Sequence, residues 1–388
     1  MSATSNKKTD SLPPYISQAQ AVAEFYGFQN ARDTIRSIKS KTPQKKLHCE
    51  HPFIENRFNL LTTLAHAPIK KQPLYLYSLV RPRGSAPLRL ELDITHTSAS
   101  IAEALLLRSS ISILKELGYA PLSVEINSIG DSVCKTTFSK ECGAYFRKRM
   151  SDLPPEVKDL VRRDIKQALL HTQESAIDIH EEAPKPIDFL SDTSRLHFAQ
   201  VIEYLDGMNI PYSINSVLFG RTPYYSKTIF VIKNGNPGDS RAHILAEGGR
   251  YDDLPRMAGI RKSVPSVGVT LFPEKNTPPP HLKPQKKNKS KNCPQLCIIQ
   301  IGFEARLLSL IVIEQLREAG IAIAQNLAFD RIGGQLEEVE RRHIPFTLII
   351  GYKEALDQSV IVRDMETRSQ ETVSLKRLVA YLKHTCAL

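Results

Sequence analysis

The most informative segment of this chain is Ala-Glu-Gly-Gly-Arg-Tyr-Asp-Asp-Leu, at residues 246–254. Two adjacent glycines, Gly248 and Gly249, open a charged and aromatic run directly after the apolar, strand-like segment 243–246. Glycine weakens a strand and usually marks a bulge or a point where a ligand or a second backbone comes close. The stretch therefore predicts a strand with an unusually close neighbour.

The sequence around this stretch predicts an α+β core with a largely antiparallel sheet over residues 13–275, after a polar tail at residues 1–12 that we expect to be disordered. Residues 74–80 and 88–94 alternate in polarity around a turn with glycine and two prolines, which predicts a hairpin. Periodic helices are expected at 15–28 and 100–117, ended by Gly27 and Gly118. Further strands are expected at 122–126, 212–215, 227–232 and 243–246, and a charged helical region at about 133–174.

Residues 276–294 predict an exposed linker, because three prolines are followed by a run of lysines. Beyond the linker, residues 295–388 alternate between strands and helices, which predicts a separate α/β domain. The expected strands are 295–301, 321–324, 346–351 and 360–364, and the expected helices are 304–319, 334–342 and 375–384.

The composition favours a partner that carries many phosphates. The 388 residues are 41% hydrophobic, enough for two or three domains, and their formal charge is +11. Six scattered cysteines, with no apolar N-terminal region and no long apolar run, predict a soluble, reduced, cytoplasmic chain without a membrane contact. Cys293 and Cys297 have no second pair at zinc spacing, so we expect no metal site.

Several segments, in the same order along the chain, resemble the class II histidyl-tRNA synthetase family. The stretch 246–254 resembles the family's glycine-rich strand, and Tyr-Tyr-Ser-Lys-Thr-Ile-Phe at 224–230 resembles its second histidine-recognition motif. Similar segments also occur at 21–28 (the helix before motif 1), 125–131 (an Ile-Asn-Ser-Leu-Gly-like turn), 183–198, 266–269 (the entry to motif 3) and 302–382 (the anticodon-binding domain). The resemblance implies a class II aminoacyl-tRNA synthetase-like core plus a C-terminal α/β anticodon-binding-like domain.

What the family does is implied for this chain by the same resemblance: joining histidine to tRNA with ATP and Mg²⁺, as a homodimer paired through motif 1. Activation in this family needs arginines that hold the ATP phosphates, a task suited to the planar guanidinium. The resemblance assigns the motif 2 arginine to Arg81, with Arg89 on the return strand as a second phosphate contact. The alternative is that both are solvated charges of the hairpin.

Two other motifs depart from the family pattern. Gly220 stands where the catalytic arginine belongs, and Pro223 replaces the family's aspartate. Arg221 is one residue away, but in an extended segment one residue reverses the face to which a side chain points. At motif 3, Glu274 is kept, whereas Lys275 replaces the arginine and lacks its planar fork.

The resemblance also implies a pocket for histidine. The segment between Phe28 and Tyr75 is too short for the family's Arg-Pro-Glu-Gly-Thr loop, which leaves Glu55 as the nearby carboxylate for the α-amino group. In the alternative interpretation, Tyr225 is a core aromatic residue and the glycine pair is a bulge. Arg250 then forms a structural ion pair with Asp252 or Asp253. The residues expected to line the pocket are Tyr224, Tyr225, Gly248, Gly249, Arg250 and Tyr251.

Three functions stay open on the sequence. The first is a histidyl-tRNA synthetase-like protein that binds tRNA or another RNA, with weakened or lost activation of histidine. The second is a working histidine–tRNA ligase that uses Arg81, Arg89, Arg221 and Lys275. The third is a histidine-sensing regulatory subunit like the synthetase-related partner of ATP phosphoribosyltransferase. The RNA contacts are expected from the linker lysines Lys283, Lys286, Lys287, Lys289 and Lys291.

Overall fold

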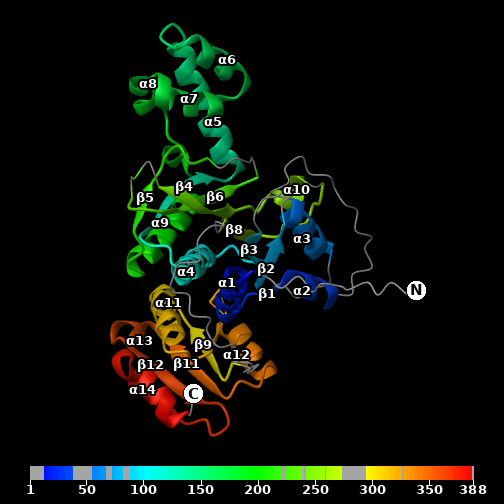
Figure 1. Cartoon of the computed structure of the whole chain (residues 1–388), viewed down its shortest axis with the longest axis vertical. Helices are drawn as coiled ribbons and strands as arrows, with labels where there is room; N and C mark the ends of the chain where they lie inside the picture. Colours follow the sequence, from blue (N-terminus) through cyan, green and yellow to red (C-terminus); the bar gives the residue numbers. More distant parts are fainter. Residues whose placement is uncertain are drawn as a thin grey trace, which may run out of the picture.

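The computed structural model describes residues 13–37, 55–66, 72–81, 88–219, 224–237, 239, 242–257, 259–272, 294–325, 327–329 and 331–386. Three parts follow one another along the long axis of the molecule: a helical arm, a core built on a large sheet, and a C-terminal domain (Figure 1). The predicted tail at 1–12 and nearly all of the predicted linker at 276–294 lie outside the described residues.

The described part of the core contains one eight-stranded sheet in the order β1-β2-β3-β8-β7-β6-β4-β5. It is antiparallel except at its two edges, where β1 pairs with β2 and β5 pairs with β4 in parallel. The strands are β1 (Gln29–Asn30), β2 (Leu74–Val80), β3 (Arg89–Thr95), β4 (Leu122–Gly130), β5 (Tyr212–Ile214), β6 (Ser226–Asn234), β7 (His243–Arg250) and β8 (Ser266–Leu271). The predicted hairpin is confirmed, because β2 and β3 are antiparallel neighbours.

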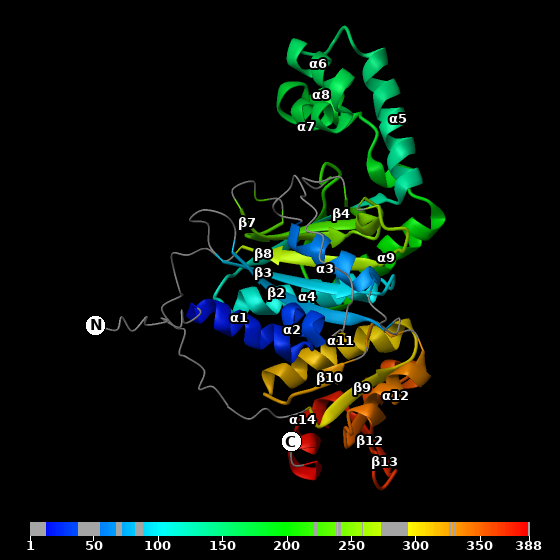
Figure 2. The ribbon, with the colours of Figure 1, turned by 90° about the vertical axis from the view of Figure 1, so that its right-hand side faces the viewer.

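Helices cover both faces of this sheet. One face packs on α1 (Pro14–Phe25), α4 (Ile101–Glu116) and α9 (Asp192–Gly207). The opposite face packs on α3 (Glu55–His66), with α10 (Leu254–Met257) against α3 and α2 (Ala31–Ser37) near the β1 edge. We call these two sides the α4 face and the α3 face. Figure 2 shows the strands between these layers.

Glycines end the first two predicted helices, as expected. Gly27 and Gly118 have φ angles of 83° and 86°, a left-handed conformation that costs glycine little. Directly after Gly27, the N–H of Phe28 donates to the carbonyl of Ala23, which closes the last turn of α1.

The helical arm consists of several helices where the sequence predicted one helical region. Pro154 and Pro155 interrupt it, because proline is tolerated at a helix start but not inside a helix. Asp164 then caps the next helix by accepting from the N–H groups of Lys166 and Gln167. The elements are α5 (Ser132–Lys148), α6 (Pro155–Arg163), α7 (Ile165–Ser175), α8 (Ile177–Glu181) and the 3₁₀ turn η1 (Pro186–Phe189).

The C-terminal domain has its own sheet, ordered β10-β9-β11-β12-β13 in its described part. The expected strand at 321–324 is reduced to two paired residues, and β13 was not predicted. That edge strand exposes all of its residues except Val373, so it shows no apolar alternation. The elements are β9 (Leu296–Gln300), α11 (Phe303–Glu318), β10 (Ala324–Gln325), α12 (Ile332–Arg341), β11 (Phe346–Ile350), α13 (Tyr352–Leu356), β12 (Ser359–Asp364), β13 (Gln370–Ser374) and α14 (Leu375–Thr385).

The C-terminal domain packs directly on the α4 side of the core. Apolar residues of both parts form one continuous cluster, and the rings of Tyr204 and Phe303 stack with centroids 4.6 Å apart. Arg317 of α11 also donates to Glu116 of α4 at 2.7 Å. The sequence predicted a separate domain, whereas the structure shows that packing as well as a chain connection joins it to the core.

Candidate functional site

The glycine-rich stretch lies on β7, and the structure shows what comes close to it. A Cβ on Gly248 would lie 2.6 Å from the carbonyl oxygen of Gly268, and one on Gly249 would lie 2.7 Å from that of Thr228. The pairing register of β6 with β7 shifts between Ser226 and Ile229, which is a bulge opposite Gly249. The close neighbour that the sequence predicted is therefore a second backbone. A contact of these glycines with a ligand stays a prediction.

A buried cluster on the α3 face joins helix α3 to strand β3 and to the residue that follows β7. Arg57 of α3 donates from Nε to Oδ1 of Asp93 at 2.7 Å, and the hydroxyl of Tyr251 donates to the same oxygen. The Arg57 guanidinium lies 5.6 Å from the centroid of the Tyr251 ring. A Cβ at Gly268 would lie 2.1 Å from Oδ1 of Asp93, so glycine at this position makes room for the cluster.

This cluster is fully buried but incompletely hydrogen-bonded. Arg57 is 1% exposed and Asp93 is 0% exposed. Within the described residues, Nη2 of Arg57 and Oδ2 of Asp93 are buried without a hydrogen-bond partner. Such atoms are rare in native structures, because each costs about 1–3 kcal/mol of desolvation.

Charge balance in the cluster depends on the carboxylates of β3. Burial opposes the charged form of Arg57, but Asp93 and Glu91 outweigh burial and raise the pKa of its guanidinium. Glu91 accepts from Nδ2 of Asn56 at 2.7 Å, and its own pKa is raised by burial despite the nearby Arg57. Arg57 therefore stays charged, and Asp93 is its paired carboxylate.

Three of the predicted pocket residues meet beside the cluster. The ring centroids of Tyr224 and Tyr225 are 4.5 Å apart, and those of Tyr224 and Tyr251 are 6.4 Å apart. Burial raises the pKa of the Tyr225 and Tyr251 hydroxyls, so both are neutral and can serve as donors. The structure thus brings these tyrosines together on the α3 face, and their contact with a ligand stays a prediction.

The predicted phosphate-binding arginines of the hairpin lie at strand ends. Arg81 follows β2 and is exposed. Arg89 begins β3, and its guanidinium lies 5.1 Å from the centroid of the Phe272 ring. Partial burial lowers the pKa of Arg89. Glu55, the predicted partner of an α-amino group, is the half-buried first residue of α3.

Several other predicted site residues cannot be placed. Arg221, Lys275 and Glu274 lie outside the described residues, as do the five linker lysines expected to bind RNA. Their roles stay predictions.

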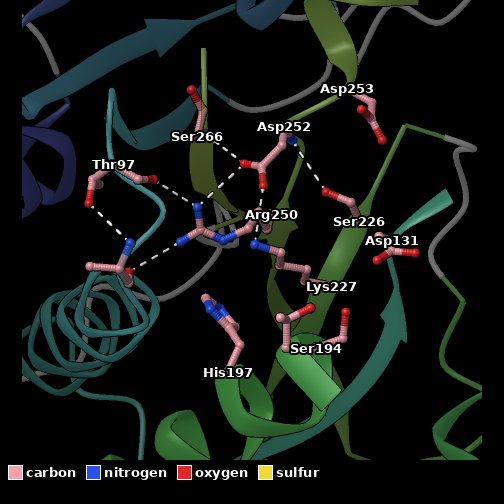
Figure 3. Close-up of polar contacts among 12 residues, drawn as sticks. Thr97, Asp131, Ser194, His197, Ser226, Lys227, Arg250, Asp252, Asp253 and Ser266 are labelled. Atoms are coloured by element: carbon pink, nitrogen blue, oxygen red, sulfur yellow. Dashed lines mark hydrogen bonds and ion pairs between the residues drawn. The ribbon is translucent and has the colours of Figure 1, made fainter. Parts of the chain in front are cut away.

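Arg250 lies on the α4 face, and Figure 3 shows its contacts with Thr97 and Asp252. The three tyrosines pack instead into the cluster of the α3 face. Nε and Nη2 of Arg250 both donate to the carboxylate of Glu103 at 2.7 Å, a bidentate pair. The remaining N–H groups donate to the carbonyls of Thr97 and Ala99 and to Asp252. All five N–H groups are thereby used. Arg250 forms the ion pair with Asp252 of the alternative interpretation, and Glu103 is its main partner. A contact of Arg250 with a ligand stays a prediction.

The same network extends to neighbouring elements. Nε2 of His197, on α9, lies 2.7 Å from Oε1 of Glu103. Burial disfavours the Glu103 carboxylate, but Arg250 and His197 outweigh burial and lower its pKa to about 2. Asp252 in turn accepts from the N–H of Ser266 and lies 3.8 Å from Nζ of Lys227 (Figure 3). The network links α4 and α9 to the sheet.

The sequence contained a signal for the buried charges that were missed. Glu103 lies in an otherwise apolar helical run, and Arg57 precedes the apolar positions of α3. Glu91 and Asp93 alternate with leucine and isoleucine on β3. A charged residue inside an apolar pattern is rarely buried unless it is paired. Which residues form the pairs cannot be read from this signal.

A separate surface cleft of about 490 Å³ lies between the arm and the segment that follows β5. It is distinct from both charge clusters, and it is lined by Leu169, His180, Glu181, Ala183, Pro184, Lys185, Ser216 and Val217. Among the described residues, no group of His, Cys, Asp and Glu side chains is arranged to hold a metal ion. No helix in that part of the chain has the length and apolarity needed to cross a bilayer.

Comparisons with known proteins agree with this architecture. Residues 295–385 match the family model of the anticodon binding domain. The fold is similar to that of the apo histidyl-tRNA synthetase of S. aureus, with a TM-score of 0.51 and 21% identity, over 99% of this chain and 100% of that chain. The fold therefore defines a class II aminoacyl-tRNA synthetase-type core with an anticodon-binding domain.

Similar sequences extend the comparison to most of the chain. The chain is 26% identical over 361 residues to the histidine–tRNA ligase of Rippkaea orientalis, which covers 92% of this chain and 81% of that protein. It is 27% identical over 379 residues to the chloroplastic histidine–tRNA ligase of Porphyra purpurea, covering 94% and 83%. The chain is thus similar to histidine–tRNA ligases over most of its length, at modest sequence identity.

Proposed function

We propose that this chain is an RNA-binding member of the family in which activation of histidine by ATP is weak or absent. The observation that carries the proposal is the state of the two buried arginines. Asp93 neutralises Arg57 on the α3 face, and the N–H groups of Arg250 are all bound on the α4 face. Neither guanidinium is available in this state to hold a triphosphate.

The other charges of the described α3 face also fit Mg²⁺-ATP poorly. Arg81 and Arg89 lie at the ends of β2 and β3, but Glu91 and Asp93 follow Arg89 on the same strand and face. Carboxylates repel phosphates strongly where water is excluded. Two arginines at a strand edge would have to hold the polyphosphate against this repulsion.

RNA binding is supported by charge and by domain content. The formal charge is +11, and residues 295–385 match an anticodon binding domain. We assign the RNA contacts to this domain and to the linker lysines Lys283, Lys286, Lys287, Lys289 and Lys291. The proposal includes tRNA as the preferred RNA, a domain division at 276–294, a homodimer, and a cytoplasmic location. The buried free thiols of Cys134, Cys142 and Cys386 are compatible with a reducing compartment.

Histidine-dependent exchange of pyrophosphate into ATP tests the proposal. We expect exchange at least a hundredfold below that of an active ligase of the family measured in parallel, with tRNA binding retained. Exchange at the rate of that control enzyme would refute the proposal.

The second candidate is an active histidine–tRNA ligase with ATP and Mg²⁺, and the alignment to ligases over most of their length favours it. In that case Arg81, Arg89, Arg221 and Lys275 would handle ATP. Thermal stabilisation by histidine without exchange or tRNA affinity would instead indicate a histidine sensor.

The salt dependence of RNA binding tests the linker assignment. Replacing the five linker lysines with glutamine should reduce the slope of log K against log [salt] by about one unit for each phosphate that the variant no longer neutralises. An unchanged slope would remove the linker from the RNA-binding surface.

A further inference from the structure

Arg57 is a cation that the chain places inside its own candidate pocket. Its guanidinium lies against the carboxylate of Asp93 and the ring of Tyr251, and it is 1% exposed. A carboxylate beside an aromatic face is the arrangement with which proteins recognise small organic cations. The group that satisfies this arrangement here belongs to α3.

Arg57 and Asp93 form fewer hydrogen bonds with each other than a guanidinium and a carboxylate can form. A guanidinium and a carboxylate can form two parallel hydrogen bonds, as Arg250 and Glu103 do. Arg57 forms one, from Nε, and leaves its Nη2 and Oδ2 of Asp93 without partners among the described residues. A single hydrogen bond is easier to exchange for another cation than a bidentate pair.

We propose that Arg57 is a displaceable internal cation, which occupies the place against Asp93 and Tyr251 that a compact organic cation, such as a primary ammonium, takes when a ligand binds. Exchanging one cation for another keeps Asp93 neutralised, whereas removing Arg57 alone would leave a buried, unpaired carboxylate. The pocket is thus closed by its own α3 helix in the described state. This inference rests on the proposed function, since it explains why a family member with tyrosines in place would bind histidine weakly.

The experiment compares ligand binding by the full chain and three variants with calorimetry. The variants are Arg57→Gln, Arg57→Gln with Asp93→Asn, and Arg250→Gln as a matched control on the α4 face. The probes are histidine, histamine, which keeps the ammonium but lacks the carboxylate, and imidazolepropionate, which lacks the ammonium.

Arg57→Gln should bind histidine and histamine at least tenfold more tightly than the wild-type chain, because Asp93 then lacks the countercharge of Arg57. Imidazolepropionate should show no gain. The gain should disappear in the double variant and should be absent in Arg250→Gln. Equal affinity of the wild type and Arg57→Gln, or an equal gain in the double variant, would overturn the proposal.

A further variant tests the proposal if Arg57→Gln does not fold. Arg57→Lys keeps the charge but has a shorter side chain without the planar fork, and it should bind histamine at least threefold more tightly than the wild type. No gain in this folded variant would overturn the proposal. These outcomes are separate from pyrophosphate exchange: robust exchange by the wild type refutes the proposed function, whereas unchanged binding by the Arg57 variants refutes the displaceable cation.

Discussion

Arg57 and Arg250 are both buried arginines on the same sheet, one on each face, and they differ in how completely they are bound. Arg250 uses all five N–H groups, with a bidentate Glu103 as its main partner. Arg57 has one hydrogen bond to Asp93, and its Nη2 has no partner among the described residues. A complete network stabilises a fold, whereas an incomplete one marks a place where something else can bind. This difference separates the scaffold of the molecule from its candidate pocket.

Replacing Arg250, whose N–H groups are all hydrogen-bonded, should have the largest effect on stability. Arg250→Met leaves Glu103 buried without its main countercharge, and we expect the free energy of unfolding to fall by about 4 kcal/mol. Chemical denaturation measures the loss. The double variant Glu103→Leu, Arg250→Met should recover most of it, because both charges are then gone. A loss below about 1 kcal/mol in the single variant would show that the network does not hold the α4 face.

Lowering the pH should weaken the contribution of the Glu103 network on the α4 face to stability. The pKa of Glu103 is lowered from its ordinary 4.5 to about 2, so its contribution is present above pH 4.5 and is lost as the pH falls toward 2. A shift of this size corresponds to about 3 kcal/mol. Denaturation midpoints between pH 6 and pH 3 should fall in the wild type and fall less in Glu103→Gln. Parallel curves would contradict the assignment.

The pKa of Glu91 on the α3 face is shifted the other way. A raised pKa contributes stability at low pH that is lost as the pH rises through the folded-state value. We therefore expect the contribution of Glu91 to the free energy of unfolding of the wild type to decrease as the pH rises above 4.5. Glu91→Gln should make this decrease smaller, whereas Glu103→Gln should leave it unchanged.

Arg57→Met should cost less than Arg250→Met. One hydrogen bond to a charged group is removed, so we expect a decrease of about 2–3 kcal/mol in the free energy of unfolding. A cost equal to or above that of Arg250→Met would abolish the distinction between the two faces. The double variant Arg57→Met, Asp93→Asn is the matched control, and it should be more stable than the single variant.

The smallest effect is expected at Arg89. Its guanidinium lies over the Phe272 ring at the edge of the sheet, and Arg89→Lys gives up the planar contact while keeping the charge. We expect the free energy of unfolding, measured by thermal denaturation, to fall by about 0.5–1 kcal/mol. A loss above about 2 kcal/mol would place Arg89 with the buried arginines.

The sequence predicted most of the scaffold because local rules apply there. The hairpin of β2 and β3 follows from alternation and a proline-glycine turn, and α1 ends where Gly27 adopts its left-handed conformation. The charge pattern of the arm predicts one helical region, but Pro154 and Pro155 divide it, because they start a new helix. β13 was missed because an edge strand with one buried residue carries no periodic signal.

The sequence alone predicts the order of the elements, the glycine positions that close packing requires, and the family resemblance, because these features depend on residues near one another in the chain. Which charges meet depends on the tertiary structure. Asp93 is 36 residues from Arg57, and Glu103 is 147 residues from Arg250. Pairing over such distances depends on the register of β3, β7 and β8 and on the placement of α3 and α4. For this reason the sequence did not reveal that Arg250 pairs with Glu103 or that Arg57 pairs with Asp93.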